Sequence, residues 1–129
     1  MKPMYQVFIA EDEPAALQHL CNIIRIKCQN FQVVGTAENG QEALEQLESF
    51  HPDILITDVK MPVMDGIMLA KRVKERYPDL LTVIISGYQD FSYAQSALRF
   101  GVCDYILKPV KPSVSRIWWR SKNICVKGN

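Results

Sequence analysis

The chain has 129 residues, a length that favours one domain with a substantial hydrophobic core. Hydrophobic residues make up 48% and charged residues 22%, as is typical of a soluble globular domain. The net charge of +1 is unevenly spread: residues 1–107 carry 9 basic and 14 acidic side chains, whereas residues 108–129 carry 6 basic side chains and no acid. The body is therefore mildly acidic, and the basic tail is expected to be solvated.

The four cysteines give no signal for a metal site. They form no Cys-x-x-Cys pair and have no metal-binding spacing with the two histidines. Cys21 and Cys28 lie seven residues apart on a predicted helix and are expected to be small apolar core residues. Free thiols suit a reducing cytoplasm. We find no signal-peptide pattern and no apolar run that would span a membrane, so we expect a cytoplasmic protein with no membrane partner.

Two strand–helix pairs are predicted in the first 50 residues. Residues 7–10 (VFIA) form a short buried strand that ends at three acids, Glu11, Asp12 and Glu13. Pro14 starts a helix, since proline is favoured in the first turn. Its apolar face is predicted to hold Leu17, Leu20, Cys21, Ile24 and Cys28. Residues 32–37 (QVVGTA) are a less apolar second strand, which fits a sheet edge, and Asn39-Gly40 starts a second helix.

Residues 54–58 (ILITD) are the central strand, an apolar run bounded by proline on both sides. Such a run is typical of a strand buried on both faces. It ends in a carboxylate, Asp58, which is costly to bury unless it is paired or bound to a metal. Asp65-Gly66 starts a third helix, on which Leu69, Val73 and Tyr77 share one face.

Two further strand–helix pairs are predicted. Residues 80–85 (LLTVII) form a fourth strand that ends at Ser86, and a helix capped by Asp90 is expected to close at Gly101. Residues 105–107 (YIL) form a fifth strand that ends at Lys108. Pro112 or Ser113 is the expected start of a fifth helix.

The strand–helix alternation predicts an α/β fold with a parallel sheet. Right-handed crossovers leave few topologies. We predict a flavodoxin-like, doubly wound five-stranded sheet of order 2-1-3-4-5 with helices on both faces.

Polar side chains stand at four predicted strand ends. In a parallel sheet these ends share one edge, and strands one and three are neighbours, which places Asp12 close to Asp58. Two close carboxylates repel unless a cation lies between them, and oxygen ligands favour Mg²⁺. With the cation of Lys108 and the hydroxyl of Ser86, the set predicts a phosphoryl-transfer site. Taken singly, each residue fits a turn, a helix cap or the surface; the set of four carries the prediction.

Four stretches together resemble the receiver domain of bacterial two-component response regulators. They are residues 9–14 (IAEDEP), 57–66 (TDVKMPVMDG), 85–88 (ISGY) and 105–109 (YILKP). The resemblance covers residues 5 to about 112. It implies that Asp58 is the phosphoacceptor and that a sensor histidine kinase is the donor. It also implies that Mg²⁺ is held by Asp12, Asp58 and the main-chain carbonyl of Lys60, that Glu11 holds a metal-bound water, and that Lys108 pairs with the phosphoryl oxygens.

The resemblance further implies a conformational switch. Ser86 would bond a phosphoryl oxygen and Tyr105 would rotate inward, changing the face made by helix four, strand five and helix five. That face is a candidate homodimer contact. Residues 87–94 (GYQDFSYA) resemble receivers attached to AraC-type DNA-binding regions, and no such output region lies in this chain.

The tail departs from the receiver pattern. Receivers continue with an acidic, Leu-rich helix, whereas residues 113–120 (SVSRIWWR) hold no acid, and adjacent tryptophans cannot share one helix face. We therefore expect residues 1–112 to form the receiver core, and residues 113–129 to be an atypical fifth helix and basic tail of altered or vector-derived sequence.

Three other functions fit the sequence less well. A phosphatase of the haloacid dehalogenase class needs a second Asp two residues after the nucleophile, where this chain has Lys60. A flavin-binding module needs a phosphate-cradling loop after strand one, where this chain has three acids that would repel phosphate. A pseudo-receiver is disfavoured by the intact set of site residues. The sequence thus favours a signalling phosphoacceptor, not an enzyme that turns over an external substrate, and implies no cofactor beyond Mg²⁺.

Overall fold

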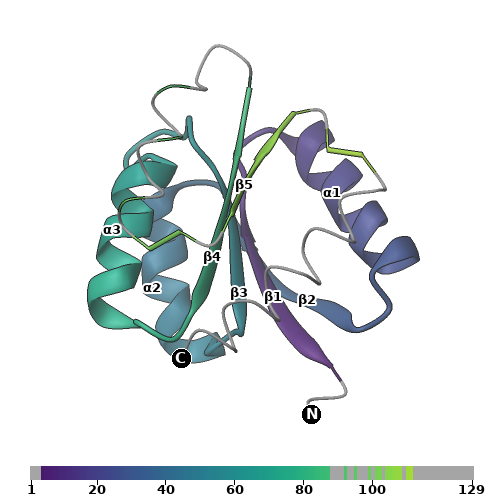
Figure 1. The fold of residues 1–129 in the computed structure, drawn as a ribbon, viewed down its shortest axis with the longest axis horizontal. Coiled ribbons are helices and arrows are strands. Elements are labelled where there is room, and N and C mark those ends of the chain that lie inside the picture. Colours follow the sequence, from purple (N-terminus) through teal and green to yellow (C-terminus); the bar gives the residue numbers. More distant parts are fainter. Residues whose placement is uncertain are drawn as a thin grey trace.

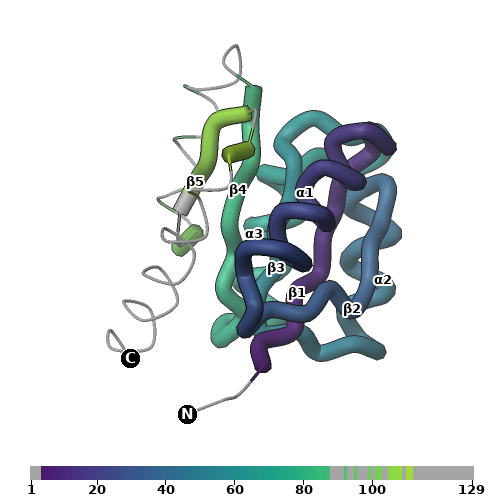
Figure 2. The backbone as a smooth tube through the Cα atoms, turned by 90° about the vertical axis from the view of Figure 1, so that its right-hand side faces the viewer, coloured from purple at the N-terminus to yellow at the C-terminus, as the bar shows by residue number. Residues whose placement is uncertain are grey.

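The computed structural model describes residues 4–87, 92, 95, 99, 101–102, 104–108 and 110–111. Five strands form one parallel sheet (Figure 1). They are β1 (Tyr5–Ala10), β2 (Phe31–Ala37), β3 (Ile54–Asp58), β4 (Leu81–Ser86) and β5 (Asp104–Leu107). Their order is β2-β1-β3-β4-β5, which confirms the predicted fold class and topology. The predicted edge position of the second strand is also correct (Figure 2).

Helices cover both faces of the sheet. One face carries α1 (Pro14–Lys27), and the other carries α2 (Gly40–Phe50) and α3 (Gly66–Arg76) (Figure 1). The predicted starts of these three helices are confirmed. Pro14 is the first residue of α1, and the side chains of Asn39 and Asp65 cap α2 and α3, each accepting a main-chain N–H bond of 2.8 Å.

The core lies in two layers because successive strand residues point to opposite faces. On β1, Val7 and Ile9 pack on the α1 side, whereas Phe8 and Ala10 pack on the side of α2 and α3. All four are fully buried. A buried large apolar side chain stabilises the fold by about 1.5–3 kcal/mol, so packing on both faces holds the sheet together.

The predicted core face of α1 differs from the structure in two ways: two of its residues are less buried than expected, and one further residue is buried. Leu20, Ile24 and Cys28 are buried, but Leu17 and Cys21 are only half-buried and lie at the rim of the core. Cys28 follows the last turn of α1 as its cap residue. Ile23 is buried although it was not predicted, because the apolar stripe of α1 is wider than the single row of positions that the spacing indicated.

Strand boundaries differ slightly from the prediction. β1 begins at Tyr5, which pairs with Phe31 of β2. β4 begins at Leu81 and not at Leu80, because the Leu80 N–H donates to the Tyr77 carbonyl at 3.0 Å and so belongs to the preceding turn. β5 begins one residue earlier than predicted, at Asp104.

The helix predicted after Asp90, the fifth helix and the boundary near residue 112 lie outside the described residues. Gly101 is described and has a φ of +86°, the left-handed conformation expected of a glycine that ends a helix. Among the described helices, none combines the length and the apolar character that crossing a membrane requires.

Candidate functional site

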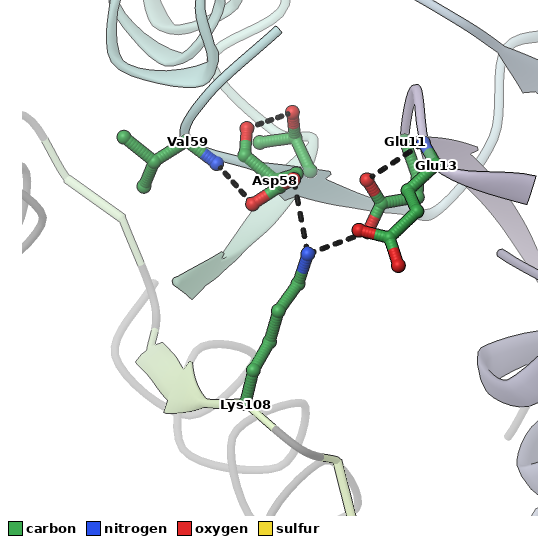
Figure 3. A network of polar contacts seen from close by, with 6 residues as sticks. Glu11, Glu13, Asp58, Val59 and Lys108 are labelled. Carbon is green, nitrogen blue, oxygen red and sulfur yellow. Dashed lines mark hydrogen bonds and ion pairs between the residues drawn. The ribbon is translucent and has the colours of Figure 1, made fainter. Parts of the chain in front are cut away.

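The carboxyl edge of the sheet brings three predicted site residues into direct contact. Glu11 follows β1, Asp58 ends β3 and Lys108 follows β5. The Lys108 Nζ lies 2.9 Å from Glu11 Oε1 and 3.0 Å from Asp58 Oδ2 (Figure 3). The ammonium of one strand end is therefore shared between the carboxylates of two others.

Asp58 is held by the main chain as well as by the ammonium. Its Oδ1 accepts the Val59 N–H at 2.8 Å, and the Thr57 hydroxyl donates to the Asp58 carbonyl oxygen at 3.0 Å. Every residue of β3 is buried, and Asp58 is 8% exposed. A carboxylate with so little water contact is stable only with such partners, so its orientation is set before any ligand arrives.

Glu11 has a raised pKa. Its side chain is buried, and its Oε2 accepts the Glu13 N–H at 3.3 Å. Burial raises the pKa of Glu11 to about 7; the Asp58 carboxylate adds to the rise and Lys108 opposes it. Burial by itself would lower the pKa of Lys108, but its bonds and charge attraction to Glu11 and Asp58 prevail and raise it. Lys108 therefore stays cationic at neutral pH, where Glu11 titrates.

Three carboxylates meet at this edge. Glu11, Asp12 and Asp58 each offer an oxygen, and these oxygens all lie within 4.8 Å of one another. Glu11 and Asp58 are buried, whereas Asp12 is exposed and faces solvent. Oxygen-only donors with negative charge fit a hard divalent cation such as Mg²⁺, which keeps several waters and so needs an open side. The residues present therefore fit the predicted metal.

A pH-dependent stability follows from Glu11. Since its folded pKa is about 7 and its ordinary value is 4.5, the folded state binds more protons between these values, and the metal-free protein loses stability as pH rises through that window. Glu11→Gln removes this loss. We expect the variant's stability relative to the parent to increase by roughly 1–3 kcal/mol between about pH 5 and about pH 8. Denaturant unfolding of the variant and the parent, both in chelator, measures this difference in stability at the two pH values. An equal difference at both would contradict the raised pKa of Glu11.

Ser86 and Tyr105, the two predicted switch residues, lie on the neighbouring strands β4 and β5. Ser86 ends β4 and is fully buried, and its carbonyl accepts the Lys108 N–H at 2.8 Å. Within the described part of the chain, the buried Ser86 Oγ has no hydrogen-bond partner, which costs about 1–3 kcal/mol. Tyr105 lies on β5 opposite Ile84 and is half-buried. Lys60 lies exposed in the loop that follows β3.

Two features of the site were not predicted from the sequence. One is the ion pair between Glu11 and Lys108, which competes with Asp58 for the same ammonium. The other is the role of Gly66: a Cβ at this position would lie 1.9 Å from the Asp58 carbonyl oxygen. The Gly66 N–H also donates to the Val59 carbonyl at 2.8 Å. The only sequence signal for this close approach is the glycine itself, at the first position of α3.

Comparison with known proteins places this chain in a family. The protein family described as "Response regulator receiver domain" matches residues 7–116 of this chain. The chain is 41% identical over 106 residues to the uncharacterized transcriptional regulatory protein YesN of Bacillus subtilis (strain 168), covering 82% of this chain and 29% of YesN. It is 37% identical over 113 residues to an uncharacterized response regulatory protein of Vibrio cholerae, covering 88% of this chain and 42% of that protein.

A solved structure is also similar. The REC domain of AraT, a response regulator from Geobacillus stearothermophilus, superposes with a TM-score of 0.87 at 37% identity, covering 97% of this chain and 98% of that one. The fold and the site thus define a doubly wound α/β signalling module with acids and a lysine at its carboxyl edge. The chain belongs to the response regulator receiver domain family of two-component systems. It spans less than half the length of YesN and of the Vibrio relative.

Proposed function

We propose that this chain takes a phosphoryl group from a sensor histidine kinase onto Asp58. An Asp58 carboxylate oxygen attacks phosphorus, the phosphorus–nitrogen bond of the donor's phosphohistidine breaks, and the imidazole leaves with the electron pair and takes up a proton. The product is an acyl phosphate on Asp58. The observation that carries the proposal is the Lys108 ammonium, 3.0 Å from Asp58 Oδ2 at the edge where three carboxylates gather.

Lys108 stabilises the charge that is transferred. In the resting protein its ammonium is divided between Glu11 and Asp58. When Asp58 becomes an acyl phosphate, its carboxylate loses its negative charge, and the phosphoryl oxygens now carry negative charge at this place. The ammonium then pairs with those oxygens, within reach of its present position. A charge fixed before reaction needs little reorganisation during it.

The acids supply the metal site in this proposal. Asp12, Asp58 and the main-chain carbonyl of Lys60 would hold Mg²⁺, and Glu11 would hold a metal-bound water. When bound, Mg²⁺ neutralises oxygens of the transferring group. The oxygen-only donor set within 4.8 Å supports this assignment. With a metal site and a lysine at one edge, the chain would assist its own phosphorylation and dephosphorylation. It would act as a signalling phosphoacceptor and would not turn over an external substrate.

Ser86 and Tyr105 act as the switch. The phosphoryl group adds about −1.5 to −2 charge and three acceptor oxygens. The buried Ser86 hydroxyl, which lacks a partner in the described structure, then gains one. Because that bond forms only in the phosphorylated state, it favours a second conformation in which Tyr105 turns inward.

The switched face would be made by β5 and the predicted helices four and five, which lie outside the described residues, and it would control an output region and a homodimer contact. We propose a DNA-binding output of AraC type in the parent protein, which acts in the cytoplasm. Relatives support a role in transcription: over 74 residues, 57% of this chain, the sequence is 46% identical to the DNA-binding transcriptional regulator NtrC of Escherichia coli (strain K12), covering 16% of NtrC.

Metal removal tests the proposed chemistry. With Mg²⁺ and a small acyl phosphate, intact mass spectrometry should show one added phosphoryl group. Excess chelator should abolish the addition, because the acids of the cluster then carry more charge than the Lys108 ammonium offsets and repel the anionic donor, and restored Mg²⁺ should recover it. Equal phosphorylation with and without chelator would contradict the metal site.

A further inference from the structure

A histidine outside the acidic cluster is connected to Lys108. His19 lies on α1, and its Nε2 is 2.7 Å from the main-chain carbonyl oxygen of Val110, 91 residues away in sequence. Two residues before Val110, the Lys108 N–H donates to the Ser86 carbonyl at 2.8 Å. The segment that carries Lys108 is therefore attached to β4 at one point and to α1 at another.

The space beside this connection is hollow. A cavity of about 310 Å³ is lined by Glu11, Ala16, His19, Leu20, Lys108 and Val110, among others. Side chains that border a cavity of this size are not fixed by close packing on that side. Within the described structure, the His19–Val110 bond is thus a direct polar link across the hollow between α1 and the Lys108 segment.

We propose that His19 is a positioning residue for phosphoryl transfer. Its ring donates the Nε2–H to the Val110 carbonyl, which holds the Lys108 segment against α1 and keeps the ammonium within reach of Glu11 and Asp58. A carbonyl only accepts, so the bond selects the Nε2–H form of the ring. The effect of His19 on phosphoryl transfer rests on the function proposed above, whereas its effect on the position of the Lys108 ammonium does not.

Two substitutions separate the hydrogen bond from the bulk of the side chain. His19→Leu keeps volume and removes the donor, whereas His19→Gln keeps an N–H donor at a similar distance from the main chain. Gln18→Leu is the matched control, since Gln18 is exposed on the same helix and its side chain donates to Asn22. With Mg²⁺ and a small acyl phosphate, we expect phosphorylation about tenfold slower in His19→Leu, because a displacement of about 1 Å costs up to about a hundredfold. His19→Gln should stay within about twofold of the parent, and the control should match it.

A second readout does not depend on phosphorylation. The ammonium resonance of Lys108 in the metal-free protein reports its contact with the two carboxylates. It should shift in His19→Leu and return toward the parent value in His19→Gln. A His19→Leu protein with the parent's rate or the parent's resonance overturns the proposal, and so does a His19→Gln protein as impaired as His19→Leu. If the parent itself takes no phosphoryl group, the proposed function fails and the resonance alone decides whether His19 positions Lys108.

Discussion

Asp58→Asn is expected to abolish phosphoryl addition to the chain while leaving the fold intact. The carboxamide has nearly the shape of the carboxylate, and its oxygen can still accept the Val59 N–H that Asp58 accepts at 2.8 Å. It lacks the negative charge and the nucleophilic oxygen, however, so no acyl phosphate forms. Lys108 keeps Glu11 as its partner, 2.9 Å away, which limits the loss of stability. Intact mass after incubation with Mg²⁺ and a small acyl phosphate measures the effect.

Asp65→Asn is the matched control for this substitution. Asp65 ends the loop between Asp58 and α3, and it caps α3 by accepting the Met68 N–H at 2.8 Å. Asparagine caps a helix about as well as aspartate, so this variant should accept phosphate like the parent. Phosphorylation of Asp58→Asn to the parent's extent, or its loss in both variants, would remove Asp58 from the centre of the mechanism.

Gly66→Ala is expected to have the largest effect on stability, a loss of about 3 kcal/mol or more. A methyl group at this position would lie 1.9 Å from the Asp58 carbonyl oxygen and 2.8 Å from the Asp58 carbonyl carbon. Both are main-chain atoms of a buried strand, so neither can turn away as a flexible side chain can. The variant must push α3 away from β3 and move Asp58 with it. We therefore expect a lower melting temperature together with slower phosphorylation.

Gly35→Ala is the informative comparison. A methyl group there would meet ring atoms of Phe8 and Phe50, the nearest at 2.8 Å, in the edge strand β2. Rings can shift where a main chain cannot, so the loss of stability should be smaller than in Gly66→Ala. The rate of phosphorylation should match the parent's, because Asp58 is two strands away from β2. A Gly66→Ala protein that melts and reacts like the parent would show that the close approach of α3 to Asp58 is unimportant.

The sheet and most of the site could be predicted because both depend on local patterns. Apolar runs such as residues 54–58 indicate buried strands, and their alternation with helices leaves few topologies. Once the strand order is known, residues at the carboxyl ends must meet at one edge. The proximity of Glu11, Asp58 and Lys108 thus follows from topology, whereas their chemical roles remain proposals.

What could not be predicted depends on distances between elements. The contact of His19 with Val110 joins positions 91 residues apart, and a single histidine on a helix gives no sign of its partner. The distance that makes Gly66 necessary is set by how closely α3 approaches β3, which no spacing encodes. The division of the Lys108 ammonium between two acids likewise depends on side-chain reach across β4, and not on any motif.

The central claim is that Asp58, and no other acid of the cluster, becomes the acyl phosphate. Borohydride reduction after phosphorylation converts an aspartyl phosphate to homoserine, and peptide mass spectrometry then locates the converted residue. We predict homoserine at position 58 only, dependent on Mg²⁺. Conversion at Asp12 or Glu11, or phosphate retained on the Ser86 hydroxyl with residue 58 unchanged, would contradict it.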